Sequence, residues 1–232
     1  MLAALRGVLR AAWRLGLMSA DDYRLAAEVE PVRGSTLPAG RALSSGDLRA
    51  LFRTCADDPR PSGIRDAAIL ALAYGAGLRR SEIVALDVEH IEPQTGAVTI
   101  RRGKGRKDRT AYLANGALDA VRDWLACRGP QPGALFWPVN KGGGLLSRRM
   151  TDQSIYSLLR RRAAQAGVAA FSPHDCRRTF VGDLLDNGVD LATVKEMAGH
   201  SSIQTTARYD RRGEAAKRKA SGALSVPYVS RS

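Results

Sequence analysis

One stretch decides the fold, and it reads SPHDCRRTFVGDLLDNGVDLATVKEMAGHSSIQTTARYD over residues 172–210. Apolar residues recur through it at helical spacing and predict three helices, at residues 174–187, 190–198 and 202–209. Gly188 and Gly199 are typical helix terminators. Asp190 and Ser202 are typical N-caps, whose side chains accept the first backbone N–H groups of a helix. The stretch therefore predicts short helices joined by tight corners that are rich in polar and cationic residues.

Helical patterns also fill most of the chain before this stretch. They predict further helices at residues 2–17, at 22–28, after Ser44 or Ser45, and at 62–76, 80–86, 115–127 and 152–167. Strand patterns occur in one zone, as VTIRR at 98–102 and RTAYL at 109–113, joined by the basic turn GKGRKD. We therefore expect a mainly α-helical domain with one small antiparallel β-sheet, an α+β fold.

Composition divides the chain into four parts. The segment EPVRGSTLPAGRALS at residues 30–44 contains two prolines and two glycines, which is typical of a linker. The predicted parts are N-terminal helices at 1–30, a linker at 31–43, the main domain at 44–211 and a C-terminal tail at 212–232. The tail is first charged and then apolar, which suits a helix followed by a docking segment.

The charge of the chain is far from balanced. It carries 36 Lys and Arg against 23 Asp and Glu, a formal net charge of +13. Such a surplus indicates a polyanionic partner, and nucleic acid is the leading candidate. An anionic membrane is the rival, but the sequence has no long apolar span and no lipidation motif, so we expect no membrane partner.

Cysteine and histidine content argues against disulfides and against a bound metal. The three cysteines, Cys55, Cys127 and Cys176, lie far apart and form no Cys-x-x-Cys pair. The three histidines do not have the spacing of a metal-binding helix. We therefore expect a cytoplasmic protein with no metal site and no cofactor.

Two segments before residue 110 carry groups suited to phosphoryl chemistry. GAGLRRSEIVAL at 75–86 places Arg79 at a helix start, one turn before Glu82, which could hold the guanidinium in place. The turn RRGKGRKDR at 101–109 could bring Lys104 close to a DNA backbone. The plainer interpretations are an exposed Arg–Glu helix pair and a hairpin that adds only nonspecific affinity.

Residues 172–210 supply two further segments. His174 and Arg177 share one face at a helix start, where they could bind one phosphate and exchange protons. Tyr209 follows His200 by nine residues, and surrounding cations could stabilise its phenolate as a nucleophile. The plainer interpretations are a helix-start histidine with satisfied hydrogen bonds and a tyrosine that only packs. The order of these groups along the chain is more specific than any one of them.

In that order, Arg, Lys, His-x-x-Arg, Gly-His and Tyr resemble the motifs of the tyrosine recombinase (phage integrase) family, from about residue 43 to 211. GLRRSE resembles the first arginine box, GKGRKDR the β-hairpin box, HDCRRTF the His-x-x-Arg box and AGHSSIQTTARYD the last box. The resemblance implies the catalytic-domain fold of DNA breaking-rejoining enzymes. Two departures, Cys176 and Ala198 where the family usually has leucine, keep those positions apolar.

The resemblance implies a role for each matched residue. The catalytic set would be Arg79, Lys104, His174, Arg177, His200 and the nucleophile Tyr209, with Glu82 in support. Lys107 is the alternative to Lys104 as the catalytic lysine. DNA contacts are expected from Arg80, Arg101, Arg102, Arg106, Lys107, Arg109 and Arg178. The reaction would be site-specific DNA recombination or integration through a 3′-phosphotyrosine intermediate, without ATP or metal.

The resemblance also implies an assembly. Family members act on double-stranded DNA, with four protomers on two sites, so we expect a homotetramer on DNA and a monomer without it. The source would be a bacterium, a phage or a mobile element, and the protein would be associated with the nucleoid. Residues 1–30 would be the last helices of a core-binding domain, which family members usually carry before the catalytic domain.

Two other functions stay open at this point. A type IB topoisomerase uses similar chemistry to relax supercoiled DNA, although the four boxes are closer to those of integrases. A DNA-binding or regulatory fragment of a recombinase, with little activity alone, would have the same charge and fold.

Overall fold

The computed structural model describes residues 2–29, 40–101, 108–210, 212–225 and 227–228. The chain forms two compact units, Met1–Pro38 and Ala39–Ser232. Residues 40–43, which composition assigns to a linker, pack instead within the second unit. The reason is local: the backbone N–H of Leu43 donates to the Thr179 hydroxyl at 2.8 Å, and the Leu43 side chain is only 4% exposed.

The first unit is a pair of helices, α1 (Leu2–Arg14) and α2 (Ala20–Ala27). The Trp13 and Tyr23 rings stack with their centroids 5.3 Å apart and join the two helices. The first helix ends three residues earlier than its apolar pattern predicts. Gly16 adopts a left-handed conformation with φ of 72°, which turns the chain back toward α2.

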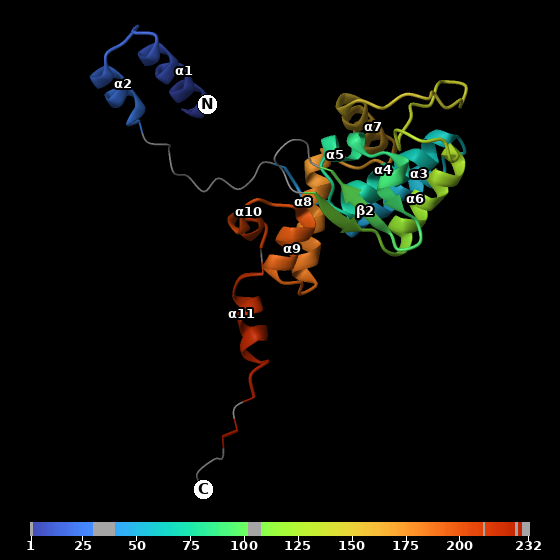
Figure 1. Cartoon of the computed structure of the whole chain (residues 1–232). Helices are drawn as coiled ribbons and strands as arrows, with labels where there is room; N and C mark the ends of the chain where they lie inside the picture. Colours follow the sequence, from blue (N-terminus) through green and yellow to red (C-terminus); the bar gives the residue numbers. More distant parts are fainter. Residues whose placement is uncertain (1, 30–39, 102–107, 211, 226, 229–232) are drawn as a thin grey trace. The chain divides into compact units, whose positions relative to one another are not determined.

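The second unit is built mainly from helices (Figure 1). In chain order they are α3 (Ser45–Ala56), α4 (Pro61–Gly75), α5 (Arg80–Ala85), the short 3₁₀ helix η1 (Val88–His90), α6 (Asn115–Arg128), α7 (Asp152–Gln165), α8 (Pro173–Asp186), α9 (Leu191–Ala198), α10 (Ile203–Ala207) and α11 (Gly213–Ser221). Helix α4 is the central element, because residues 68–73 are fully buried. A helix that is apolar on every side is typical of a domain interior.

A three-stranded antiparallel sheet, in the order β1-β2-β3, completes the predicted α+β fold. Its strands are β1 (Ile91–Glu92), β2 (Ala97–Ile100) and β3 (Arg109–Tyr112). In the register of β2 and β3, Ile100 pairs with Arg109. The sequence patterns miss β1, because two residues are too few to show alternation. Residues 102–107, which include Lys104 and Lys107 of the predicted basic turn, lie outside the described residues.

Helices α8 and α9, with the turn that follows α10, pack around a second, smaller apolar cluster. It contains Phe180, Val181, Leu185, Val194, Ala198 and Tyr209. The predicted caps are confirmed: the Asp190 carboxylate accepts the first backbone N–H groups of α9, and Gly199 ends that helix with φ of 61°. Helix α10 ends at Ala207, two residues earlier than predicted, so Tyr209 lies in the turn that follows it.

The C-terminal tail contains α11, the helix that its charged half predicts. Across the described segments, no helix is both long enough and apolar enough to cross a membrane.

Candidate active site

Arg79 and Arg109 converge on Glu82 from two different elements. Arg79 is the N-cap of α5, and its guanidinium donates to Glu82 at 2.8 Å, while its backbone N–H donates to the other carboxylate oxygen at 2.8 Å. Arg109 reaches the same carboxylate from β3 at 2.9 Å. Burial would raise the pKa of Glu82, but the backbone N–H and the two arginines lower it below its ordinary value. Glu82 is therefore a charged anchor for both arginines at neutral pH.

Arg177 is the most deeply buried cation of the site, with only 3% of the residue exposed. One of its terminal nitrogens donates to the carbonyl oxygen of Gly77 at 2.6 Å, and the other donates to that of Ala198. The second terminal nitrogen of Arg79 donates to the carbonyl of Gly199 at 3.1 Å. Burial, and next the charge of Arg79, lower the pKa of Arg177 to about 9, so it stays protonated at neutral pH.

His174 and Tyr209 meet across the site. The Nε2 atom of His174, in the first turn of α8, lies 3.1 Å from the Tyr209 hydroxyl oxygen. Burial, and next the charge of Arg177, lower the pKa of His174 below its ordinary value. A neutral imidazole can accept the proton of the hydroxyl, which a protonated one cannot.

The Tyr209 ring is held from two sides and is 9% exposed. It stacks on the His200 ring with the centroids 6.1 Å apart, and the Arg178 guanidinium lies 5.7 Å from its centroid. These two contacts orient the ring so that its hydroxyl lies next to His174.

His200 lies in the corner between α9 and α10. Its Nδ1 atom is 2.9 Å from the Thr206 hydroxyl oxygen, and the residue is 8% exposed. Burial is the main cause that lowers its pKa to about 4, and Arg177 and Arg79 add to the effect. His200 is therefore neutral at pH 7 and offers a ring N–H rather than a full charge to an anion.

A cleft of about 390 Å³ opens beside these residues. It is lined by Arg79, Arg80, Ser81, Asp152, Tyr156, Ser172, Pro173, His174 and Arg177. Arg80 pairs with Asp152, the first residue of α7, at 3.5 Å. The arrangement offers an anion two guanidinium groups, the start of α8 and a nearby tyrosine hydroxyl, which is what an attack on a phosphodiester requires.

The structure thus brings together five of the six predicted catalytic residues, and the sixth, Lys104, lies outside the described residues. The structure also identifies groups that sequence reasoning missed. Thr206 orients His200, and backbone carbonyls orient the two arginines. A buried threonine three residues before Tyr209 matches no known sequence motif. Every residue has a backbone carbonyl, so the sequence does not indicate which carbonyls accept from an arginine.

The seven predicted DNA contacts divide into three groups. Arg102, Arg106 and Lys107 lie outside the described residues. Arg101 is exposed and Arg80 lines the cleft, as a DNA contact would. Arg109 and Arg178 differ from the expectation, because both point inward: the Arg109 side chain is 11% exposed beside Glu82, and Arg178 is 5% exposed. Their positions fit residues that shape the site better than residues that contact DNA.

Asp87, Glu89 and His90 are the acidic and histidine group that comes closest to a metal site in the described segments. Their ligand atoms lie within 4.8 Å of one another. However, the backbone N–H of Asp87 donates to Nδ1 of His90 at 3.0 Å, so the ring proton is on Nε2, where a metal would bind. The Asp87 carboxylate is already paired with Arg149. These residues do not fit a metal ion well.

Most of the chain is similar in sequence to known proteins. Residues 41–215 match the model of the phage integrase family. The chain is 36% identical over 222 residues to the tyrosine recombinase XerD of Mycobacterium leprae, covering 90% of this chain and 67% of the relative. It is 30% identical over 186 residues to the tyrosine recombinase XerA of Pyrococcus furiosus, covering 79% and 62%. The chain spans about two thirds of the length of these curated relatives.

Solved structures share the fold. The crystal structure of a XerA recombinase matches with a TM-score of 0.66 at 22% identity, over 98% of this chain and 85% of that one. A XerH recombinase bound to its palindromic difH substrate, in a post-cleavage complex, matches with a TM-score of 0.63 at 21% identity, over 95% and 71%. Since the family model covers most of the chain, the protein belongs to the phage integrase family of tyrosine recombinases, enzymes that cleave and rejoin DNA in site-specific recombination.

Proposed function

We propose that this chain carries out site-specific DNA strand cleavage and rejoining, with Tyr209 as the nucleophile. The observation that carries the proposal is the 3.1 Å contact between the Tyr209 hydroxyl and Nε2 of His174. It lies in a site with two arginines that are fixed by backbone carbonyls. Family membership and the net charge of +13 support DNA as the substrate.

In the first step, the Tyr209 oxygen attacks the scissile phosphorus and its proton moves to His174. The bond from phosphorus to the 5′-oxygen breaks, which leaves a 3′-phosphotyrosine and a 5′-hydroxyl. We assign Lys104 as the acid that protonates the leaving oxygen, with Lys107 as the alternative. In the second step, the 5′-hydroxyl of a partner strand attacks the phosphotyrosine and gives its proton back to the lysine. The bond from phosphorus to the Tyr209 oxygen breaks, and that oxygen recovers its proton from His174.

Charge stabilisation is the task of the other residues. The pentavalent phosphorane carries more negative charge on its non-bridging oxygens than the phosphodiester does. Arg79 and Arg177 supply permanent positive charge, and His200 supplies a ring N–H donor. Because one phosphoester bond replaces another, the exchange needs no external energy source, and we expect no ATP, metal or other cofactor.

The assembly is a proposal of the same kind. We expect a monomer without DNA and a homotetramer on two DNA sites, with the tail at 212–232 docked on a neighbouring protomer. The first part of that tail is a helix, α11, in which Glu214 and Lys217 pair at 2.7 Å. We expect the protein to act at the nucleoid, in the cytoplasm.

Suicide DNA that carries the recognition site and a nick beside the scissile phosphate tests the function. The short leaving strand diffuses away, so a covalent protein–DNA adduct should accumulate with DNA that has the site and not with scrambled DNA. Relaxation of plasmids that lack the site would favour the topoisomerase alternative. Tight binding without any adduct would favour the DNA-binding fragment.

A further inference from the structure

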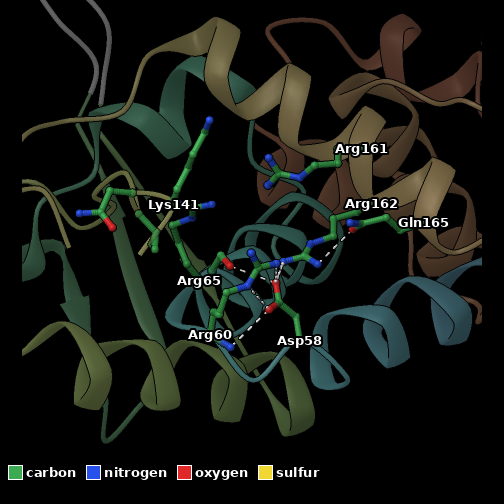
Figure 2. A pocket seen from close by; sticks show the side chains of 10 residues that line it. Asp58, Arg60, Arg65, Lys141, Arg161, Arg162 and Gln165 are labelled. Carbon is green, nitrogen blue, oxygen red and sulfur yellow. Dashed lines mark hydrogen bonds and ion pairs between the residues drawn. The ribbon is translucent and has the colours of Figure 1, made fainter. Parts of the chain in front are cut away.

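A second cavity, of about 340 Å³, lies toward the C-terminal end of α7 (Figure 2). We call it the arginine pocket, after the charged residues that line it: Asp58, Arg60, Arg65, Lys141, Arg161 and Arg162. They come from the loop between α3 and α4, the first turns of α4, the segment around residue 140 and the last turns of α7. Asp152 at the active-site end of α7 and Gln165 in this pocket are about 20 Å apart along the helix. The arginine pocket is therefore separate from the catalytic cleft.

The floor of the arginine pocket is a saturated ion network around Asp66, which is fully buried. One Asp66 oxygen accepts from Nε and a terminal nitrogen of Arg65, at 2.9 and 2.7 Å. The other accepts from Arg162 at 2.8 Å and from Arg161 at 3.3 Å. Four hydrogen bonds fill the lone pairs of this carboxylate.

Asp58, the second carboxylate, is occupied in the same way. It accepts from Arg60 at 2.8 Å, from Arg162 at 2.7 Å and from the Ser62 hydroxyl at 3.0 Å. Burial would raise its pKa, but these hydrogen bonds lower it well below the ordinary value of a carboxyl group. Both acids are thus charged and already satisfied, so the arginine pocket offers little to a cation.

Positive charge is left over. Five cationic side chains, those of Arg60, Arg65, Lys141, Arg161 and Arg162, face two carboxylates, a surplus of three charges. Within the part of the chain that the structure describes, Lys141 forms no ion pair, and the Arg161 side chain is 53% exposed with a single long contact to Asp66. Figure 2 shows Lys141 and Arg161 above the floor where Asp58, Arg60 and Arg162 are joined. Lys141 and Arg161 therefore have N–H groups that could donate to a bound anion.

We propose that the arginine pocket binds a phosphate group, with Lys141 and Arg161 as its direct ligands. Arginine and lysine are the side chains that bind phosphate in proteins, and a phosphate has enough oxygens to accept from both at once. The floor network would fix Arg162 and Arg65 beneath it and supply further positive potential. The phosphate could belong to a free small molecule or to a DNA backbone, and the chemistry of recognition is the same.

Titration calorimetry of the full chain with inorganic pyrophosphate tests the proposal. The double variant Lys141→Gln with Arg161→Gln should bind at least about tenfold more weakly than the unmodified chain. Asp66 keeps its bonds from Arg65 and Arg162 in that variant, so the fold should be intact, with an unchanged melting temperature. The matched control removes two exposed arginines elsewhere, Arg49→Gln with Arg148→Gln, and should retain pyrophosphate affinity.

Equal pyrophosphate affinity in all three proteins, or no binding to the unmodified chain at millimolar concentration, would overturn the proposal. The source of the phosphate is decided by the salt dependence of DNA binding. If the pocket holds one backbone phosphate, the double variant should lower the salt slope by about one relative to the control. If it holds a free phosphate compound, the slope stays unchanged while pyrophosphate binding is lost. The test does not depend on the proposed cleavage activity, since neither residue lines the catalytic cleft.

Discussion

The Nε2 atom of His174 lies 3.1 Å from the hydroxyl oxygen of Tyr209. This is hydrogen-bond distance, and it joins the first turn of α8 to the turn after α10. Burial, and next the charge of Arg177, lower the pKa of His174 and favour the neutral imidazole, which is the form that can accept a proton. The same positive charge would stabilise the negative charge that develops in the site during attack. We propose that the two effects together prepare Tyr209 for attack on DNA.

Arg177 should be required for cleavage more than for binding. Arg177→Ala should reduce the single-turnover cleavage rate by roughly 10²- to 10³-fold, because a preorganised donor to the developing charge is lost. Arg177→Lys should not restore the rate, since one ammonium group cannot reproduce the planar fork that holds Gly77 and Ala198. Cleavage rates and DNA affinity are measured on the same folded variants. A loss of affinity alone would show that Arg177 does not act at the scissile phosphate.

Arg109 should act through Glu82 rather than through DNA. Arg109→Gln removes a partner of the carboxylate that holds Arg79, so cleavage should slow by roughly 10- to 100-fold through misplacement of that guanidinium. Arg109→Lys keeps the charge and should recover part of the rate. The salt slope of DNA binding is the control readout and should not change. A decrease in that slope by about one would instead identify Arg109 as a phosphate contact.

Acid should destabilise the protein partly through His200. Its pKa is about 4 in the folded chain against an ordinary value of 6.5, so the unfolded chain binds the proton more readily. Stability is therefore present above pH 6.5 and is lost as pH falls, by about 2 kcal/mol at pH 5 from this group. Melting temperatures from pH 7 to 5 should fall less steeply in His200→Gln. If the melting temperatures of the unmodified chain and of His200→Gln fall equally between pH 7 and pH 5, this account of His200 is wrong.

One experiment should distinguish the roles of Lys104 and Lys107, the two candidates for the catalytic lysine. Lys104→Ala should cleave slowly on normal DNA, but should recover on DNA with sulfur in place of the leaving 5′-oxygen, because a thiolate leaves without a proton. Lys107→Ala should mainly weaken binding and lower its salt slope by about one. If 5′-sulfur DNA restores the cleavage rate of Lys107→Ala and not that of Lys104→Ala, Lys107 is the catalytic acid.

Much of the fold could be predicted from local patterns. Helix caps are local, so Asp190 and Gly199 predicted the ends of α9 correctly. The strand β1 could not be predicted, because two residues form a strand only when β2 lies beside them. Helix α10 ends early because the Tyr209 ring packs against α8 and α9, which no local pattern encodes.

The same distinction between local sequence patterns and long-range contacts applies to the active site. Side chains with a fixed order in the chain, such as His174 and Tyr209, could be found from the motifs. The inward position of Arg109 could not, since it depends on Glu82, which lies 27 residues away in sequence. The arginine pocket also depends on long-range contacts, such as that between Arg162 and Asp66, 96 residues apart.

The most direct test of the central claim is to identify the residue that becomes attached to DNA. The adduct formed on nicked suicide DNA is digested with protease and nuclease, and the modified peptide is sequenced by mass spectrometry. We predict a phosphodeoxynucleotide on Tyr209, no adduct with Tyr209→Phe, and DNA affinity in that variant within about twofold of the unmodified chain. An undiminished adduct in Tyr209→Phe, or a label on any other residue, would contradict the account.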